Sequence, residues 1–582
     1  MTLINVYSGK IKAFVDSDRD VSQLIRELIR DNPGADFYFP RPKGGKPYLL
    51  HTVEADPGDG SPCHILRIAT PNTKLHFSSE ATLYADVDFS QDNCAKPTRC
   101  AYNVIQIETQ RVPSRNKNGD GAMVQGGKIR VNPNNHGFSI GVAVLGASNV
   151  AVSKMDIKNC GYDGVHINAV GETGHVQVPQ RVVVEDCTIT ECHRTGIVVI
   201  TGRYIVIKAC RATHMDAESR YVRRSDCRKD DSFTTRDLLP EKEFEDTCTT
   251  ATGIRIEPDA DSNDLDHITI LDNYCANNRH GIRAVASHGV RARKIRFLGN
   301  ECVGNLVAGI SLNGDFNDWQ IIENDCLDQK GLTEEQNCRN ELTENQINDL
   351  GSGIEIEGAS RNGLIADNNC FANAKDGIIV RRNDGSRQRN IKINDNDCYR
   401  NGRHGINLSE QLDTHLHDNR VFLNSEDGIY INNSAIGDTD AARLSLVENK
   451  AYQNSRSGVT GINLNQAVIQ GNLLNRNGEH GLALVGSELS VLENFCIGNC
   501  HNSSYEFSHI YVCSDTSNSL FELNTCTRGP LASSRAQFGL DISFGTDTPA
   551  SNRVIANDLR NSGNPGGLAS GASVLVSAGN QV

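Results

Sequence analysis

Charged and amide side chains recur on short segments that each begin with glycine. The segments are GIRIE from Gly253, GIRAV from Gly281, GISLN from Gly309, GIEIEG from Gly353 and GIIVR from Gly377. Successive side chains of a strand point to opposite faces, so the isoleucines predict an inner face and the residues between them an outer one. The outward residues of this stretch are Arg255, Glu257, Asp259, Arg283, Asn313, Asp315, Glu355, Glu357 and Arg381.

Two glutamates of this set share one strand. Glu355 and Glu357, with Asn313 one Gly-strand earlier, form an oxygen-rich cluster that suits calcium. A calcium ion there would bind a uronate carboxylate and acidify the neighbouring carbon-bound proton. Arg381 or Arg255 would serve as the base or neutralise the enolate-like anion. The reaction would be β-elimination or, with reprotonation on the other face of the ring, epimerisation.

A pair of carboxylates would instead support hydrolysis or glycosyl transfer. Glu257 and Glu355 lie three Gly-strands apart, about 14 Å by stacking alone, which is too far for the usual pair. Asp259 or Asp315 would have to close the gap. Outward glutamates and arginines on neighbouring coils are also compatible with ordinary cross-strand ion pairs on a solvated face.

A different acid–base arrangement lies in the segment Gly161-Tyr162-Asp163-Gly164-Val165-His166. Tyr162 and His166 would act as acid and base across a sugar ring. Asp followed by Gly is also ordinary corner chemistry in this chain. Arg283 is a further catalytic candidate on the outward face, and the candidates for substrate binding are Asp259, Asp315, Asn407 and Tyr430.

The elements that position these residues form a repeat. Gly253, Gly281 and Gly309 are 28 residues apart, and a period in the twenties indicates a solenoid of stacked coils. A second word, Asn-x-Cys, runs in phase with the first, as at Asn273-Tyr274-Cys275 and Asn300-Glu301-Cys302. An Asn at one corner of each coil can form a ladder of amides and tolerates the left-handed backbone of a tight corner. At least two short strands per coil predict a parallel β-helix.

Composition excludes several classes of protein. The chain has 582 residues, a formal net charge of −14 and a pI of about 5.7, which argues against a nucleic-acid surface. No run of 18 apolar residues and no signal peptide is visible, so no membrane partner and a cytoplasmic location are expected. Many of the 19 cysteines follow the repeat, which predicts stacked buried thiols rather than a disulfide framework.

Three regions are expected along the chain. Residues 1–60 predict a cap, because apolar residues at helical spacing from Val21 to Ile29 form an amphipathic helix. Residues 61–528 predict the β-helix, with inserts at about 213–250 and 327–350 and an irregular loop at 90–135. Residues 529–582 are rich in Ser, Gly and Ala and predict a C-terminal cap or tail.

The order of an amphipathic helix, a strand ending in Tyr38-Phe39-Pro40 and then Lys46-Pro47-Tyr48 resembles the entry to the pectin-lyase-like superfamily. The resemblance implies an all-β, single-stranded, right-handed parallel β-helix behind an N-terminal helical cap. Fold-level likeness implies activity only weakly.

An Asn, then Glu-x-Glu one coil later, then an Arg on the next coil resembles chondroitinase-B-like alginate and dermatan lyases. This likeness implies calcium ligands at Asn313, Glu355 and Glu357 and a catalytic Arg381. That family also has a Lys shortly after Glu-x-Glu, where this chain has Gly358-Ala359-Ser360-Arg361, so the base stays open. The Tyr162 to His166 segment is similar to a motif of alginate C5-epimerases.

The leading prediction is a polysaccharide lyase or C5-epimerase for uronate-type sugars, with calcium as the only cofactor expected. A glycoside hydrolase or glycosyl transferase, a tailspike-like glycan-binding scaffold, and an enzyme of intracellular small-molecule metabolism are the alternatives. The expected partner is an oligo- or polysaccharide or a related small molecule, and a homo-oligomer is compatible with a solenoid.

Overall fold

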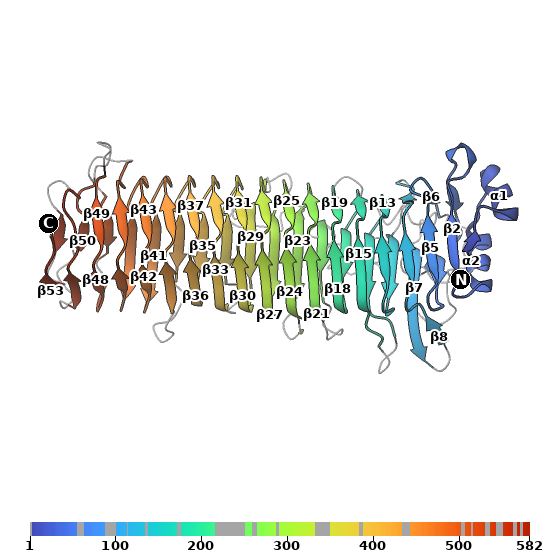
Figure 1. The fold of residues 1–582 in the computed structure, drawn as a ribbon, viewed down its shortest axis with the longest axis horizontal. Coiled ribbons are helices and arrows are strands. Elements are labelled where there is room, and N and C mark those ends of the chain that lie inside the picture. Colours follow the sequence, from blue (N-terminus) through green and yellow to red (C-terminus); the bar gives the residue numbers. More distant parts are fainter. Residues whose placement is uncertain are drawn as a thin grey trace, which may run out of the picture. The chain divides into compact units, whose positions relative to one another are not determined.

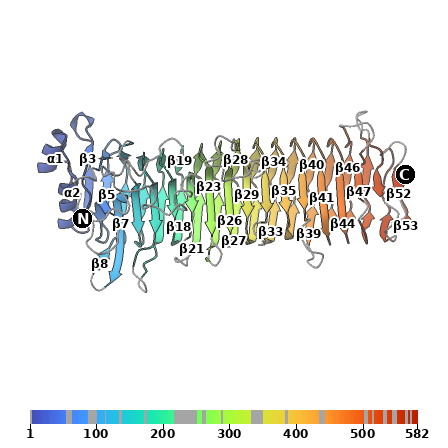
Figure 2. The ribbon, with the colours of Figure 1, turned by 180° about the vertical axis from the view of Figure 1, so that it is seen from behind.

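The computed structural model describes residues 3–54, 63–87, 101–112, 115–133, 138–171, 176–215, 251–258, 265–286, 290, 292–331, 350–382, 388–433, 443–501, 507–513, 516–529, 536–542, 551–562, 567–570 and 574–582. The chain forms two compact units, Met1–Asn305 (unit 1) and Leu306–Val582 (unit 2). Each unit is a stack of coils whose strands pair in parallel with those of the next coil, so that three sheets run along it (Figures 1 and 2). The sequence indicated at least two strands per coil, and the coils of the fold contribute strands to three sheets.

The strands that begin near the repeated glycines form one sheet, called the Gly-strand sheet below. In unit 1 it contains β4 (Cys63–Ile68), β7 (Ala101–Val112), β11 (Phe138–Leu145), β14 (Asp163–Asn168), β17 (Thr195–Val199), β20 (Thr252–Ile256) and β23 (His280–Ala286). In unit 2 it contains β26 (Ala308–Gly314), β29 (Ser352–Glu357), β32 (Ile378–Arg381), β35 (Ile406–Ser409), β38 (Ile429–Asn432), β41 (Val459–Asn465), β44 (Leu482–Ser487), β47 (Ile510–Val512), β50 (Leu540–Ile542) and β52 (Leu568–Ser570).

The Asn-x-Cys words begin the short strands of a second sheet. Its members include β22 (Tyr274–Ala276) and β25 (Glu301–Val303) in unit 1, and β28 (Asp325–Leu327), β31 (Asn369–Phe371) and β34 (Asp397–Tyr399) in unit 2. The third sheet includes β21 (Leu265–Leu271) and β24 (Ala292–Leu298) in unit 1, and β27 (Phe316–Ile322) and β30 (Arg361–Ala366) in unit 2.

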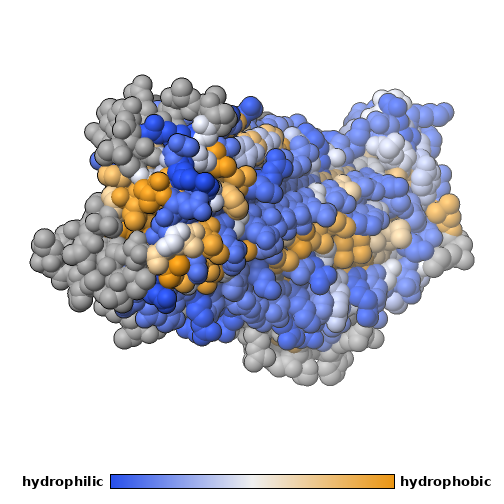
Figure 3. Space-filling model, turned by 60° about the vertical axis from the view of Figure 1, so that its left-hand side comes forward, coloured by the Kyte–Doolittle hydropathy of each residue, from blue (hydrophilic) through white to orange (hydrophobic). Residues whose placement is uncertain are grey.

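Alternation places the core as expected. Ile254 and Ile256 of β20 and Ile282 of β23 have no exposed surface. Narrow hydrophobic rows run between hydrophilic ones on the surface seen in Figure 3, because one strand position recurs coil after coil. The cysteines also stack in register, Cys275 on Cys302 and Cys370 on Cys398, and these four are buried free thiols. Cys63 differs, because it is disulfide-bonded.

The expected asparagine ladder is present, with a second one beside it. In unit 2, the amide of Asn368 donates to the side-chain oxygen of Asn396 at 2.9 Å, and Asn373 donates to Asn401 at 3.0 Å. The second ladder follows the first by five residues. The left-handed corner residue is not the ladder Asn but the one before it, such as Asp367 with φ 55°. The amide of Asn396, for example, donates to the backbone oxygens of Ile365 in the preceding coil and of Asn394 in its own coil, and the residue before it adopts the left-handed conformation.

The N-terminal cap contains two helices, α1 (Gly9–Asp16) and the expected amphipathic α2 (Ser22–Asp31), whose Ile25 and Ile29 are buried. Residues 90–135 were expected to be an irregular loop, and this is wrong for the part described. That part contains β7, β8 (Arg115–Asn118), β9 (Met123–Gln125) and β10 (Lys128–Val131). Gln106 and Glu108 of β7 alternate with Ile105 and Ile107 and are as buried as they are, and polar residues at these positions obscured the strand in the sequence.

Candidate functional site

An outward column of unit 1 brings cationic side chains together. His166, Val198, Arg255 and Arg283 lie in register on the adjacent strands β14, β17, β20 and β23. Neighbouring parallel strands are about 4.8 Å apart, so the last two arginines are side by side. Like charges opposite each other on a sheet are destabilising, so this pair requires a balancing charge.

A chain of ion pairs links this column to a buried aspartate. Asp163 has no exposed surface, and its carboxylate lies 2.9 Å from Nδ1 of His166 and 3.4 Å from Nη1 of Arg194. Arg194 and Arg255 each pair with one oxygen of Glu257. The guanidinium of Arg194 also lies 4.6 Å from the centre of the Tyr162 ring. Because a carboxylate only accepts hydrogen bonds, Asp163 holds the proton of His166 on Nδ1 and leaves Nε2 as an acceptor.

Arg255 is the least satisfied member of this cluster. Only 4% of the residue is exposed, and its Nε and Nη1 groups have no hydrogen-bond partner among the described residues. Burial lowers its pKa to about 10; Glu257 acts in the opposite direction, while Arg194 and Arg283 lower it further. Burial, together with Arg283, Arg279 and Arg255, lowers the pKa of His280 well below its ordinary value. Buried N–H groups without acceptors are costly, so this cluster is suited to an anionic ligand.

The expected cluster of unit 2 is also brought together, but it is already paired. Nη2 of Arg381 lies 2.5 Å from Glu355 and Nε lies 3.5 Å from Glu357. Asn313 donates its amide to Glu357 at 2.9 Å. Calcium prefers six to eight oxygen ligands, and two carboxylates with one amide supply few of them. Calcium stays a proposal here, and it would require Arg381 to leave both glutamates.

The remaining candidates are placed as follows. Asp315 lies 3.3 Å from Arg361, Asn407 donates to Asp376 at 3.1 Å, and the ring of Tyr430 stacks on that of His404 at 4.6 Å. Asp259 lies outside the described residues. Glu257 belongs to unit 1 and Glu355 to unit 2, so the proposed carboxylate pair is not tested.

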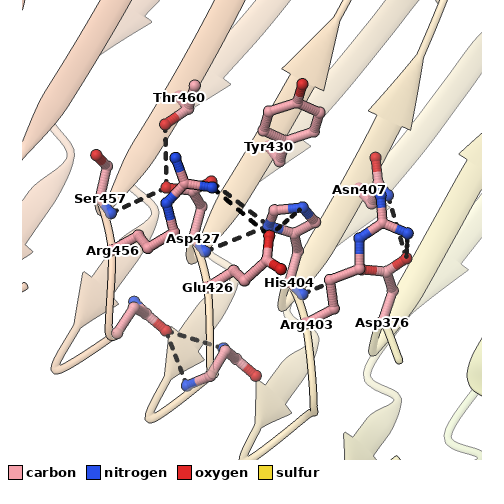
Figure 4. A network of polar contacts seen from close by, with 12 residues as sticks. Asp376, Arg403, His404, Asn407, Glu426, Asp427, Tyr430, Arg456, Ser457 and Thr460 are labelled. Atoms are coloured by element: carbon pink, nitrogen blue, oxygen red, sulfur yellow. Dashed lines mark hydrogen bonds and ion pairs between the residues drawn. The ribbon is translucent and has the colours of Figure 1, made fainter. Parts of the chain in front are cut away.

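Unit 2 contains a buried polar network around His404 and Asp427 (Figure 4). Asp427 precedes a repeated glycine, and the sequence pattern assigns such aspartates to ordinary corners. His404 and Asp427 are 2% and 1% exposed, and Nδ1 of His404 accepts the backbone N–H of Asp427 at 3.2 Å. Burial lowers the pKa of His404 to about 3 and raises that of Asp427 to about 6. Asn407, Tyr430 and Thr460 project side by side above them from β35, β38 and β41.

Sequence reasoning missed Arg194 and the role of its neighbours. Arginine recurs two residues before the repeated glycine, at Arg194, Arg279, Arg403 and Arg456. This position borders the outward face, and the recurrence is a signal that was available in the sequence. The recurrence does not indicate which of these arginines would face the column of Arg255.

Comparison with known proteins identifies the family. The chain matches the family model described as a right-handed beta helix region over residues 117–385 and 308–441, more than half of its length. The chain belongs to the right-handed beta helix family. No curated protein matches it significantly in sequence.

Three of the solved structures that the chain is similar to are the following. One is the periplasmic alginate epimerase AlgG, 16% identical over 72% of this chain and 84% of that one, with a TM-score of 0.39. Another is the A-module of the mannuronan C-5 epimerase AlgE4 of Azotobacter vinelandii, 11% identical over 83% and 89%, with a TM-score of 0.33. A third is a tailspike protein mutant of E. coli bacteriophage HK620 in complex with a hexasaccharide, 11% identical over 99% and 77%, with a TM-score of 0.41. These likenesses concern the fold alone.

Within the described residues, no helix is both long enough and apolar enough to cross a membrane. The cytoplasmic location and the possible homo-oligomer stay predictions.

Proposed function

We propose that the protein is a lyase for uronate-type polysaccharides, with its reacting centre on the outward face of unit 1. The observation that supports this is Arg255, whose buried guanidinium has two N–H groups unpaired among the residues that the structure describes and stands in register with Arg283. A sugar carboxylate at this position would supply the missing acceptors of Arg255, with the guanidinium of Arg283 on the neighbouring strand.

The chemistry begins with the proton on C5 of the uronate. Binding the carboxylate to Arg255 and Arg283 stabilises the negative charge that develops on it when this proton leaves. Nε2 of His166, held as an acceptor by Asp163, takes the proton from C5. The C4–O bond then breaks as the C4=C5 double bond forms, and the imidazolium returns its proton to the departing oxygen. Atoms and charge balance without a cofactor.

Elimination is preferred over epimerisation because one acid–base group suffices for it. Epimerisation needs a second proton donor on the opposite face of the ring. The guanidinium of Arg194 lies over the ring of Tyr162, 4.6 Å from its centre, and covers one face of it. Burial raises the pKa of Tyr162, so its hydroxyl is a weaker acid than an ordinary tyrosine and a poorer proton donor for this step.

The test incubates the protein with polymannuronate, polygalacturonate and a glycosaminoglycan and follows the ultraviolet absorbance of an unsaturated uronate. His166→Gln is expected to lower the rate at least 100-fold, since general base catalysis contributes about that much. The matched control is Arg293→Gln, which removes an exposed arginine paired with Asp266 on another sheet. Epimerisation would appear as exchange of the C5 hydrogen with deuterated water and no absorbance. New reducing ends without either signal would establish a hydrolase, and binding with no turnover would establish a glycan-binding scaffold.

A further inference from the structure

A further cluster of ionisable side chains in unit 2 lies on the third sheet, apart from the Gly-strand sheet. Strand β36 (Leu412–His417; Figure 1) ends in His417, and Asp418 follows it at the corner of the coil. Glu448 occupies the same corner in the next coil, directly after β39 (Leu444–Val447; Figure 2). The three side chains are 47%, 34% and 60% exposed, so all of them reach the solvent.

The three side chains converge on one another. One ligand atom of each lies within 4.8 Å of those of the other two. Nδ1 of His417 is 3.2 Å from an oxygen of Asp418, and Nε2 is 3.4 Å from an oxygen of Glu448. Within the described part of the chain, neither carboxylate accepts a hydrogen bond or pairs with a lysine or arginine. In that part the imidazole is therefore the only group that faces both negative charges.

This arrangement differs from an ordinary surface ion pair of the same strand, in which Asp413 lies 3.6 Å from Arg443. The corner residue of the coil after Glu448 is Gly471, so no side chain at that corner covers the far side of Glu448. Two neighbouring carboxylates without a cation repel each other. A divalent cation bound between them would remove this cost.

The imidazole determines which cation fits. Calcium and magnesium prefer oxygen ligands, whereas a ring nitrogen together with carboxylates suits zinc and related transition metals. Zinc lies about 2.0–2.2 Å from such ligands, so ligand atoms around a tetrahedral ion are about 3.3 Å apart. The two contacts of His417 are close to this separation. Only one ring nitrogen can bind a given ion, and rotation of the exposed carboxylates would bring both to the same nitrogen.

We infer that His417, Asp418 and Glu448 form a binding site for one divalent transition-metal ion, such as zinc. Three protein ligands leave the fourth position of a tetrahedral ion open to water or to a ligand from outside the chain. Because the ligands come from two successive coils, the ion would also link these coils. The site belongs to unit 2 and to another sheet than the proposed reacting centre, so this inference does not depend on the lyase proposal.

The test measures zinc binding to the chelator-treated chain by equilibrium dialysis, for wild type, His417→Gln, Glu448→Gln and the matched control His415→Gln. His415 is also exposed on β36, but its neighbours in the adjacent strands are Lys392 and Ser445, which are not metal ligands here. Wild type and His415→Gln should bind zinc equally. The other two variants should each weaken one binding event at least about tenfold, because each removes a ligand. Thermal unfolding without metal checks that every variant is folded.

Three outcomes would overturn the inference. One is an equal effect of His417→Gln and His415→Gln, which would mean adventitious binding by surface histidines. Another is a loss in His417→Gln but none in Glu448→Gln, because the site needs a ligand from both coils. The third comes from competition with calcium and magnesium, which should displace zinc at least about 100-fold more weakly than zinc itself. Equal competition would identify an unselective acidic surface instead of a metal site.

Discussion

Arg255 of unit 1 and Glu355 of unit 2 occupy the same position in their Gly-strands, two residues after the glycine, but their surroundings differ. Arg255 stands beside Arg283 and keeps two buried N–H groups that have no partner in the described part of the chain. Glu355 is nearly as buried, and it shares the single positive charge of Arg381 with Glu357. The repeat thus supplies equivalent positions, and the local charge balance decides which one can accept a ligand. Four predictions follow from this difference, in order of expected effect.

The largest effect is expected on turnover at Arg255. Arg255→Gln should lower kcat/KM for a uronate polymer about 100- to 1000-fold, because it removes a charge that stabilises the developing anion. The measurement is the rate of formation of unsaturated product. Arg381→Gln is the matched variant in unit 2 and should retain activity within about threefold. Loss of activity in Arg381→Gln but not in Arg255→Gln would indicate that the reacting centre lies in unit 2.

The free energy of unfolding should be affected more by substitution of Arg381 than by substitution of Arg255. Arg381→Met leaves the buried Glu355 carboxylate without its strongest partner and should lower the free energy of unfolding by about 2 kcal/mol. Arg255→Met removes a cation that is incompletely paired, while Glu257 keeps Arg194, so the loss should be below about 1 kcal/mol. Urea unfolding of both variants measures the difference, and similar losses would contradict the distinction between the two clusters.

Asp427 extends the comparison to a buried carboxylate without a strong counter-charge. Its pKa in the folded chain is raised to about 6. A raised acid pKa contributes stability that is present below the ordinary value near 4 and is lost as the pH rises through about 6. Asp427→Asn should therefore be about 2 kcal/mol more stable than wild type at pH 8 and equally stable at pH 4. Thermal unfolding across this range checks it, with Asp418→Asn on the exposed side of the coil as the control. A difference that does not vary with pH would exclude the buried proton as its cause.

The smallest effect concerns calcium. The guanidinium of Arg381 would occupy the position that a calcium ion would take between Glu355 and Glu357. In that case 1 mM calcium should raise the melting temperature of Arg381→Met by about 2 °C and that of wild type by less than about 1 °C. Magnesium at the same concentration is the control ion. A large calcium effect on wild type would mean that Arg381 leaves the glutamates readily.

Particular residues separate what could be predicted from what could not. The alternation in GIRIE and GIEIEG was sufficient to place Ile254 and Ile354 in the core and Arg255 and Glu355 outside it. The Asn-x-Cys words predicted the ladder of Asn368 and Asn396. Residues 101–112 were misassigned because their outward polar residues dilute the apolar pattern. Arg194 was missed because a corner residue has no fixed direction in a two-residue period.

The sequence by itself determined the parallel β-helix, the orientation of each Gly-strand and the residues on its outward face, because these depend on local periodicity. Only the tertiary structure decided that Arg381 pairs with both glutamates of unit 2, whereas Arg255 keeps two buried N–H groups without a partner among the described residues. The physical reason is that charge balance and register depend on neighbours in the next coil, which lie roughly two dozen or more residues away in the chain.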